Sequence, residues 1–218
     1  MTRTPAILLF CTLQIGLMGC QTDHSTDKKQ TMTGETAAKS KDTASANDLL
    51  FSQFVKKFPR VPLPLTIKTL EIQTTGVLQK ITGRDSMFTN SSDPEGTWAY
   101  GLLPDTAGNF KLIWLSPADV YVPVLTTFNR HGQRISEIHL GVGACGSDCC
   151  FSCAEYITIN KDLTIYSVDS IKSCDCDSAG PQEKTMKKYT RFMTGAIAAD
   201  GKISMSDIKE KPVTLPGQ

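Results

Sequence analysis

Six cysteines lie close together in the second half of this 218-residue chain and could carry out chemistry. They are Cys145, Cys149, Cys150, Cys153, Cys174 and Cys176. An even number of cysteines in an exported chain predicts disulfide bonds, because oxidising compartments favour disulfides over free thiols. All six are therefore candidates for structural disulfides.

The flanking strands suggest a pairing for one bond. A tight hairpin centred on Lys161-Asp162 in "ITINKDLTI" would place Cys174 opposite residue 149. This register favours a Cys149–Cys174 bond. Cys176 would then pair with Cys145, Cys150 or Cys153, and the connectivity beyond the first bond stays open.

Two other chemistries are open to the same cluster. Thiolates spaced as Cys149-Cys150-x-x-Cys153 and Cys174-x-Cys176 could bind zinc or an iron–sulfur cluster, although the spacing differs from two C-x-x-C knuckles. Cys150-Phe-Ser-Cys153 is a C-x-x-C sequence, which in redox proteins normally opens a helix of a βαβ unit. Structural disulfides are favoured, with a thiol-redox or metal-handling role for Cys145–Cys176 as the alternative.

Other polar residues near the cysteines predict no catalytic or metal site. Asp148, Asp175 and Asp177 could bind calcium, but loops rich in Asp and Ser are more often hydrated turns. His131 is predicted in a turn, and His139 on the polar face of a strand beside Glu137. We expect both histidines to be solvated side chains.

Motifs of enzymes and cofactor-binding proteins give no stronger indication. "GVGACG" at 141–146 looks like G-x-G-x-x-G and follows a strand, but no helix follows it, which disfavours a dinucleotide site. G-x-S-x-G, H-E-x-x-H and the phosphate-loop motif are absent. The sequence therefore predicts no cofactor, no metal and no catalytic residue, and it leans away from an enzyme.

The elements that position the cysteines are predicted to be strands. Segments rich in Ile, Val, Thr and aromatic residues alternate with short turn signals such as "AGN", "NRHG", "NKD" and "ADG". The predicted strands are 97–103, 109–116, 121–128, 134–141, 154–160, 163–172, 187–197 and 202–208. No helix of crossover length separates them, so we expect an antiparallel β-meander forming a sandwich or partial barrel.

One helix is predicted ahead of the strands, in "ANDLLFSQFVKKFP". Its apolar residues recur at helical spacing and Pro59 ends it. They are Leu50, Phe51, Phe54, Val55 and Phe58. We expect this stripe to pack on a sheet face, with a membrane-surface or partner-binding helix as the alternative.

The N-terminus predicts export. An apolar stretch from Pro5 to Met18 follows Arg3 and is shorter than the roughly 20 residues of a spanning helix. Its end, Leu17-Met18-Gly19-Cys20, resembles the lipobox of bacterial lipoproteins. The resemblance implies cleavage before Cys20 and lipidation of that cysteine, and several acyl chains together give durable anchoring.

The chain thus divides into a signal peptide (1–19), a polar tether (20–46) and one β-rich domain (47–218). Apart from Cys20, Met32 and scattered alanines the tether is polar, which leaves too little apolar surface to bury, so disorder is expected there. Lys+Arg (23) nearly balance Asp+Glu (22), which disfavours nucleic acid as a partner.

Taken together, these features predict a lipid-anchored cell-envelope protein of the bacterial lipoprotein type. Gln21 after Cys20 favours the outer over the inner membrane. The domain is expected to be a non-enzymatic binding or structural module stabilised by disulfides. Its partner would be an envelope protein, a glycan or a small ligand.

Overall fold

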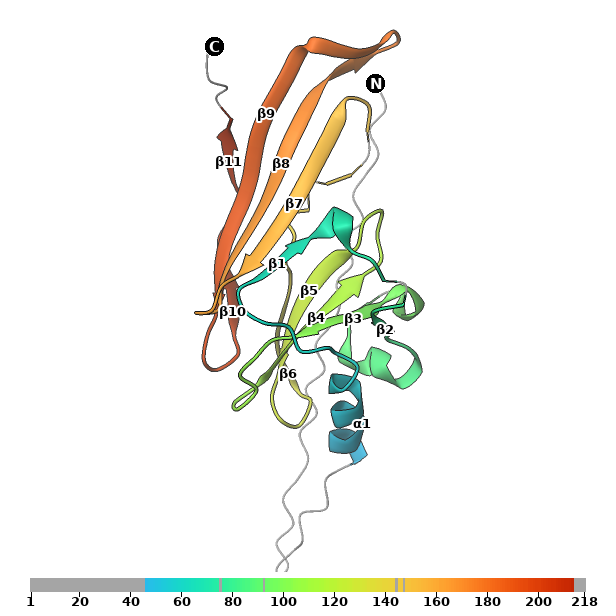
Figure 1. The fold of residues 1–218 in the computed structure, drawn as a ribbon, viewed down its shortest axis with the longest axis vertical. Coiled ribbons are helices and arrows are strands. Elements are labelled where there is room, and N and C mark those ends of the chain that lie inside the picture. Colours follow the sequence, from blue (N-terminus) through green and yellow to red (C-terminus); the bar gives the residue numbers. More distant parts are fainter. Residues whose placement is uncertain (1–45, 75, 92, 144, 147, 214–218) are drawn as a thin grey trace, which may run out of the picture. The chain divides into compact units, whose positions relative to one another are not determined.

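The computed structural model describes residues 46–213 apart from 75, 92, 144 and 147, and its fold is mainly β (Figure 1). Two antiparallel sheets and one short helix make up the domain. The sandwich alternative of the sequence prediction is confirmed. The predicted signal peptide, Cys20 and nearly all of the predicted tether lie outside the described residues.

The first sheet has five strands in the order β2-β3-β4-β5-β6. Their bounds are β2 Gln79–Lys80, β3 Trp98–Leu102, β4 Phe110–Ser116, β5 Val122–Phe128 and β6 Arg134–His139. Three short 3₁₀ helices lie in the chain around β2: Thr69–Glu71 (η1), Gly83–Phe88 (η2) and Pro94–Gly96 (η3).

The second sheet has six strands in the order β1-β7-β8-β9-β10, with β11 also pairing with β9. Their bounds are β1 Leu65–Lys68, β7 Phe151–Ile159, β8 Thr164–Asp177, β9 Gly180–Ile197, β10 Ile203–Met205 and β11 Lys209–Pro212. In Figure 1, β8 and β9 form a long hairpin that continues beyond the five-stranded sheet.

The predicted helix forms as α1 (Ala46–Val55) and packs on the outer side of the five-stranded sheet. Phe51, Phe54 and Phe58 are buried against Trp114 and Phe128 of β4 and β5. The expectation of a helix packed on a sheet is therefore confirmed. Because this face is covered, β4 is buried along nearly its whole length.

A second apolar core fills the space between the two sheets. Ile113 and Leu125 of the five-stranded sheet pack in one cluster with Ile157, Ile165 and Ile197 of the six-stranded sheet. The domain is thus layered as helix, five-stranded sheet and six-stranded sheet. Along β7 and β8 buried residues alternate with more exposed ones, so each strand turns one row inward and the other row outward.

The eight strands predicted from the sequence all form, with ends shifted by a few residues. The strands β1, β2 and β11 were not predicted. The strands β8 and β9 also run further than expected, since they continue through the segment between 173 and 186. That segment contains Cys174 and Cys176, so these two cysteines lie on a strand, as Cys153 does on β7.

Candidate functional site

All six clustered cysteines form disulfide bonds. The pairs are Cys145–Cys153, Cys149–Cys176 and Cys150–Cys174. This confirms that the cluster is a set of disulfides. Several disulfides in one domain indicate an oxidising, extracytoplasmic compartment.

The expected Cys149–Cys174 bond is wrong, because the hairpin between β7 and β8 is one residue longer than predicted. Asn160 pairs with Thr164, and Leu163 takes a left-handed conformation with φ of 64°. The loop therefore holds three residues rather than two, as in hairpins whose third loop residue is left-handed. The register moves by one, and Cys174 pairs with Cys150.

The three bonds fasten one loop to two strands. Cys145–Cys153 ties the segment after β6 to β7, while the other two bonds tie the turn just before β7 to the distal part of β8. A backbone hydrogen bond from Cys174 N–H to the Cys150 carbonyl lies beside the third bond. This part of the hairpin extends beyond the five-stranded sheet, so the disulfides supply the constraint that a second layer supplies elsewhere.

A buried carboxyl pair lies next to the first of these bonds. Glu155 on β7 is directly opposite Asp169 on β8, and both residues face inward and are buried. Their carboxyl groups share a hydrogen bond. Burial, together with the negative charge of Asp169, raises the pKa of Glu155 from 4.5 to about 7.

The glycine-rich stretch after β6 forms the other side of this site. Backbone N–H groups of Gly143 and Val142 donate hydrogen bonds to the Glu155 carboxyl group. A Cβ atom on Gly141 would lie 2.5 Å from Glu155 Oε1, so any other residue there would displace the Glu155 carboxyl group. The "GVG" sequence that resembles part of a dinucleotide motif thus binds the protein's own carboxyl group.

A pocket of about 400 Å³ opens beside this carboxyl group. It is lined by Ala118, Asp119, Val120, Val122, Gly141, Gly143, Cys145 and Glu155. Apart from the disulfide-bonded Cys145, its polar side chains are the carboxyl groups of Asp119 and Glu155. This composition suits hydrogen-bond donors or cations better than anions.

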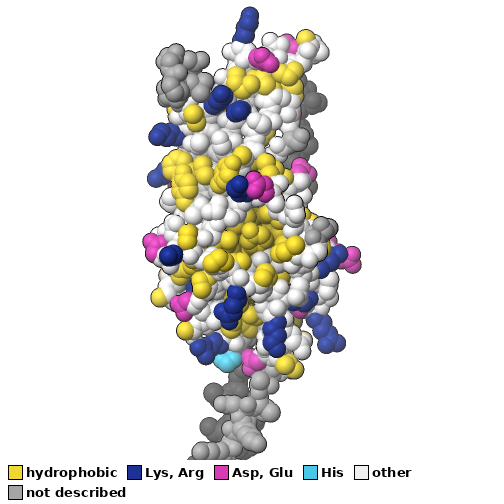
Figure 2. Space-filling model, viewed as in Figure 1, with side chains coloured by type: hydrophobic (Ala, Val, Ile, Leu, Met, Phe, Trp, Pro, Cys, Tyr) yellow, Lys and Arg dark blue, Asp and Glu magenta, His cyan; other side chains and the backbone are white. Residues whose placement is uncertain are grey.

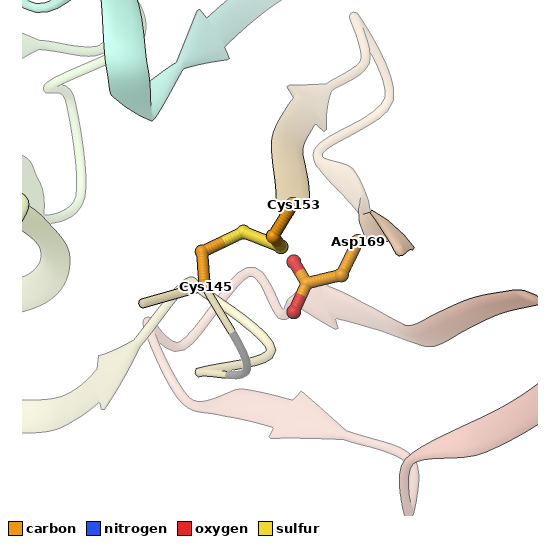
Figure 3. Close-up of side chains that lie close together, drawn as sticks. All are labelled: Cys145, Cys153 and Asp169. Carbon is orange, nitrogen blue, oxygen red and sulfur yellow. A yellow bond between two sulfur atoms is a disulfide. The ribbon is translucent and has the colours of Figure 1, made fainter. Parts of the chain in front are cut away.

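The sulfur atoms and Asp169 lie close enough to resemble a metal site. The Sγ atoms of Cys145 and Cys153 and a carboxylate oxygen of Asp169 lie within 4.8 Å of one another. Figure 3 shows the Asp169 carboxyl group pointing toward the disulfide. Because the two sulfur atoms are bonded to each other, thiolate ligands would form only after reduction.

The other polar residues considered in the sequence do not converge on this site. Asp148 accepts a hydrogen bond from the Cys149 N–H, and Asp177 accepts from Ala179 N–H and Gln182 Nε2. Within the described residues, Cys145, Cys153 and Asp169 are the one group of potential ligands that meet. The calcium reading of Asp148, Asp175 and Asp177 therefore gains no support.

The two histidines of the domain are also apart from the cluster. His131 is 73% exposed in the β5–β6 turn, where its Nδ1 lies 3.2 Å from Asp48 Oδ1 of α1. His139 is exposed at the end of β6. Glu137, predicted on the same polar face as His139, instead accepts a hydrogen bond from the buried Thr126 hydroxyl.

The outward face of the six-stranded sheet is a second candidate site. Strand register aligns one row of side chains across five strands of this face. The row is Lys68–Tyr156–Val168–Phe192–Lys209. The alternate residues of β1, β7 and β8, among them Ile67, Ile157 and Ile165, are buried in the core, so this row lies on the side away from the five-stranded sheet.

Neighbouring rows continue the same chemistry. Tyr166 lies one row away on β8, with its ring centroid 6.1 Å from that of Phe192. Tyr156 and Tyr166 are 40% and 41% exposed. In Figure 2, hydrophobic side chains gather over the strands of this sheet, with Lys or Arg side chains on both sides. We call this side of the six-stranded sheet, with the row from Lys68 to Lys209 and the rows next to it, the outer face.

Comparisons with known proteins identify no relative: no family model, no curated protein and no solved structure matches the chain. Class and compartment therefore rest on the fold and the disulfides. The chain contains an extracytoplasmic, disulfide-stabilised β domain. Among the described residues, no helix is long and apolar enough to cross a membrane.

Two features of these sites were not predicted from the sequence, although a signal existed for each. Glu155 shares an alternating row with Ile157 and Ile159, and Asp169 shares one with Ile165 and Ile171. This alternation indicates that both carboxyl groups face inward. The residues that alternate with these inward ones form the outer face, and the hairpin register determines which of them lie side by side.

Proposed function

We propose that this protein is a lipid-anchored cell-envelope protein whose β domain binds an envelope partner through the outer face. The observation that carries the binding role is the row from Lys68 to Lys209, which places three apolar side chains on an exposed sheet face. Exposed apolar groups gathered on one surface are typical of interaction sites.

The anchor in this proposal is Cys20. The lipobox resemblance at Leu17–Cys20 supports lipidation, and the disulfides support the same side of the membrane. The polar segment 20–46 would separate the lipid from the domain, so that the outer face reaches partners in the envelope. Gln21 favours the outer membrane as the site of anchoring.

Fatty-acid labelling of the full chain in bacterial cells tests the anchor. We expect labelled palmitate on the wild-type chain and recovery of the chain with membranes. Cys20→Ala should lose both, whereas Cys11→Ala should keep both, because Phe10 precedes Cys11 and does not fit a small-residue cleavage site. An unlabelled wild-type chain would overturn the anchor.

Lysine acetylation in intact cell envelopes tests the binding role. We expect Lys172 and Lys209 of the outer face to react more slowly in the envelope than in the purified full chain. Lys161 and Lys202, which are exposed in turns, serve as matched controls and should react equally in both settings. If each of the four lysines reacted at the same rate in the envelope as in the purified chain, binding through the outer face would be overturned.

A further inference from the structure

We infer that the outer face binds a linear acidic glycan. This inference rests on the proposed function and specifies the partner of the same surface. The strand register brings lysines, aromatic rings and hydroxyl groups together on this one face.

The charge of this face has one sign. Strand register and burial place five lysines on it: Lys68, Lys172, Lys188, Lys209 and Lys211. No carboxylate occupies the outward rows of β1, β7, β8 and β9 that pair with one another between Thr66 and Lys188. The outer face is therefore basic although the net charge of the whole chain is close to zero. An anionic partner is complementary to such a surface.

One acidic side chain reaches the edge of the face. Glu71, in η1, forms an ion pair with Lys68 at 3.0 Å. Within the described residues, no such ion pair involves the other four lysines. Those four are accordingly available to carboxylate or sulfate groups of a ligand, and pairing of that kind is charge-assisted.

The rings lie at the centre of the basic surface. Tyr156 and Phe192 flank Val168 in the central row, and Tyr166 lies beside Phe192. Rings on a sheet face offer flat apolar surface together with the polar tip of tyrosine. The apolar faces of sugar rings can pack on such side chains while their hydroxyl groups stay hydrated.

Hydroxyl side chains fill the positions around the rings. Thr66, Thr158 and Thr194 flank Tyr166 in its row, and Ser170 and Thr190 lie in the row on the other side. A hydroxyl group both donates and accepts hydrogen bonds, which matches the hydroxyl groups of a sugar. This lining distinguishes the surface from a purely apolar patch.

The central row has the dimensions of a polymer site. Five neighbouring strands about 4.8 Å apart extend roughly 19 Å from Lys68 to Lys209. A small pocket of about 60 Å³ lies at the Lys68 end and is lined by Lys68, Leu70, Glu71, Ala154, Glu155 and Tyr156. An extended chain crossing the strands would contact a lysine at each end and rings between them.

A membrane surface fits these features less well than a glycan. Tyr156 and Tyr166 expose only two fifths of their surface and lie on a sheet face, whereas insertion into lipid needs apolar groups buried in the headgroup region. Single-stranded nucleic acid also uses basic and aromatic surfaces. An extracytoplasmic location favours the glycan, and both other ligands are measured as competing outcomes.

Titration of the full chain in non-ionic detergent tests the inference. The probes are polygalacturonate oligosaccharides, neutral dextran oligosaccharides of equal length, an oligothymidylate, and micelles containing phosphatidylglycerol. We expect saturable binding of polygalacturonate and none of dextran. Lys172→Gln/Lys209→Gln and Tyr156→Ala should each weaken polygalacturonate binding about tenfold. Lys161→Gln/Lys202→Gln removes the same charge elsewhere and should leave the affinity unchanged.

Three results would overturn the inference of a glycan ligand. They are no binding of polygalacturonate, an equal loss of polygalacturonate affinity in the two double lysine variants, or tighter binding of oligothymidylate or lipid micelles than of polygalacturonate. The proposed function is judged separately by palmitate labelling and by lysine reactivity in the envelope. Protection of Lys172 and Lys209 without polygalacturonate binding would retain the binding role and reject the glycan.

Discussion

Glu155 and Asp169 face each other across β7 and β8, with their carboxyl groups sharing a hydrogen bond beside the Cys145–Cys153 disulfide. Two carboxyl groups within hydrogen-bonding distance of each other cannot both ionise readily in a buried site. The protein therefore holds a proton here at pH values where exposed carboxyl groups have lost theirs.

Glu155→Gln should change how stability depends on pH. The folded protein binds more protons than the unfolded chain between pH 4.5 and about 7, because the pKa of Glu155 is raised on folding. This contribution to the free energy of unfolding is complete below pH 4.5. It is lost as the pH rises through about 7, with a limiting slope of about 1.4 kcal/mol per pH unit. Urea unfolding across this range measures it.

The glutamine variant stays neutral, so its stability relative to wild type should increase from pH 4.5 to pH 8. The exposed Glu183→Gln serves as the control and should show a constant difference from wild type. A constant difference for Glu155→Gln as well would mean that the pKa of Glu155 is not raised.

Gly141→Ala should destabilise the domain by about 1–3 kcal/mol, because the new methyl group overlaps the Glu155 carboxyl group. Gly146→Ala is the matched control in the same loop, since a Cβ atom there meets nothing within 4 Å. Adding Glu155→Ala should remove part of the Gly141→Ala penalty. If thermal unfolding shows equal effects for the two glycines, the contact between Gly141 and Glu155 is not formed.

Removing disulfide bonds should lower the free energy of unfolding more where the bonds close a longer loop. Because Cys150–Cys174 lies inside the loop closed by Cys149–Cys176, both bonds have to be removed together: Cys149→Ser/Cys150→Ser/Cys174→Ser/Cys176→Ser opens a loop with a sequence separation of 27, and Cys145→Ser/Cys153→Ser opens one of 8. Chain entropy gives the longer loop an advantage of about 1 kcal/mol, within losses of about 2–4 kcal/mol each. Chemical denaturation of the two variants measures the difference, and the reverse order would contradict the entropic account.

Phe54→Ala should cost about 3–5 kcal/mol, because Phe54 is fully buried between α1 and the five-stranded sheet. Leu49→Ala, on the exposed side of the same helix, should change stability by less than about 0.5 kcal/mol. Equal costs would show that α1 does not pack through its phenylalanine face.

The strands and the helix could be predicted because each carries its own periodicity. The apolar stripe of Phe51, Phe54 and Phe58 indicates a helix, and the alternation of Ile157 and Ile159 indicates a strand with one buried face. The short strands β1, β2 and β11 carry too few residues for such a pattern. They form because longer strands offer them an edge.

The disulfide pairing could not be predicted because it depends on the conformation of one residue. Leu163 adopts a positive φ that leucine rarely takes, and nothing in "NKDLT" distinguishes a two-residue from a three-residue loop with certainty. A shift of one residue reassigns every cross-strand neighbour. The same register determines which side chains share a row with Glu155 and with Tyr156.

One intact-mass measurement tests both the disulfides and the proposed lipid anchor at Cys20. The full chain would be extracted from bacterial membranes, denatured without reductant and alkylated. We expect a chain that begins at Cys20 and carries acyl groups, with no alkylation of the six clustered cysteines. A chain that keeps residues 1–19, or that takes up alkyl groups between Cys145 and Cys176, would contradict this expectation.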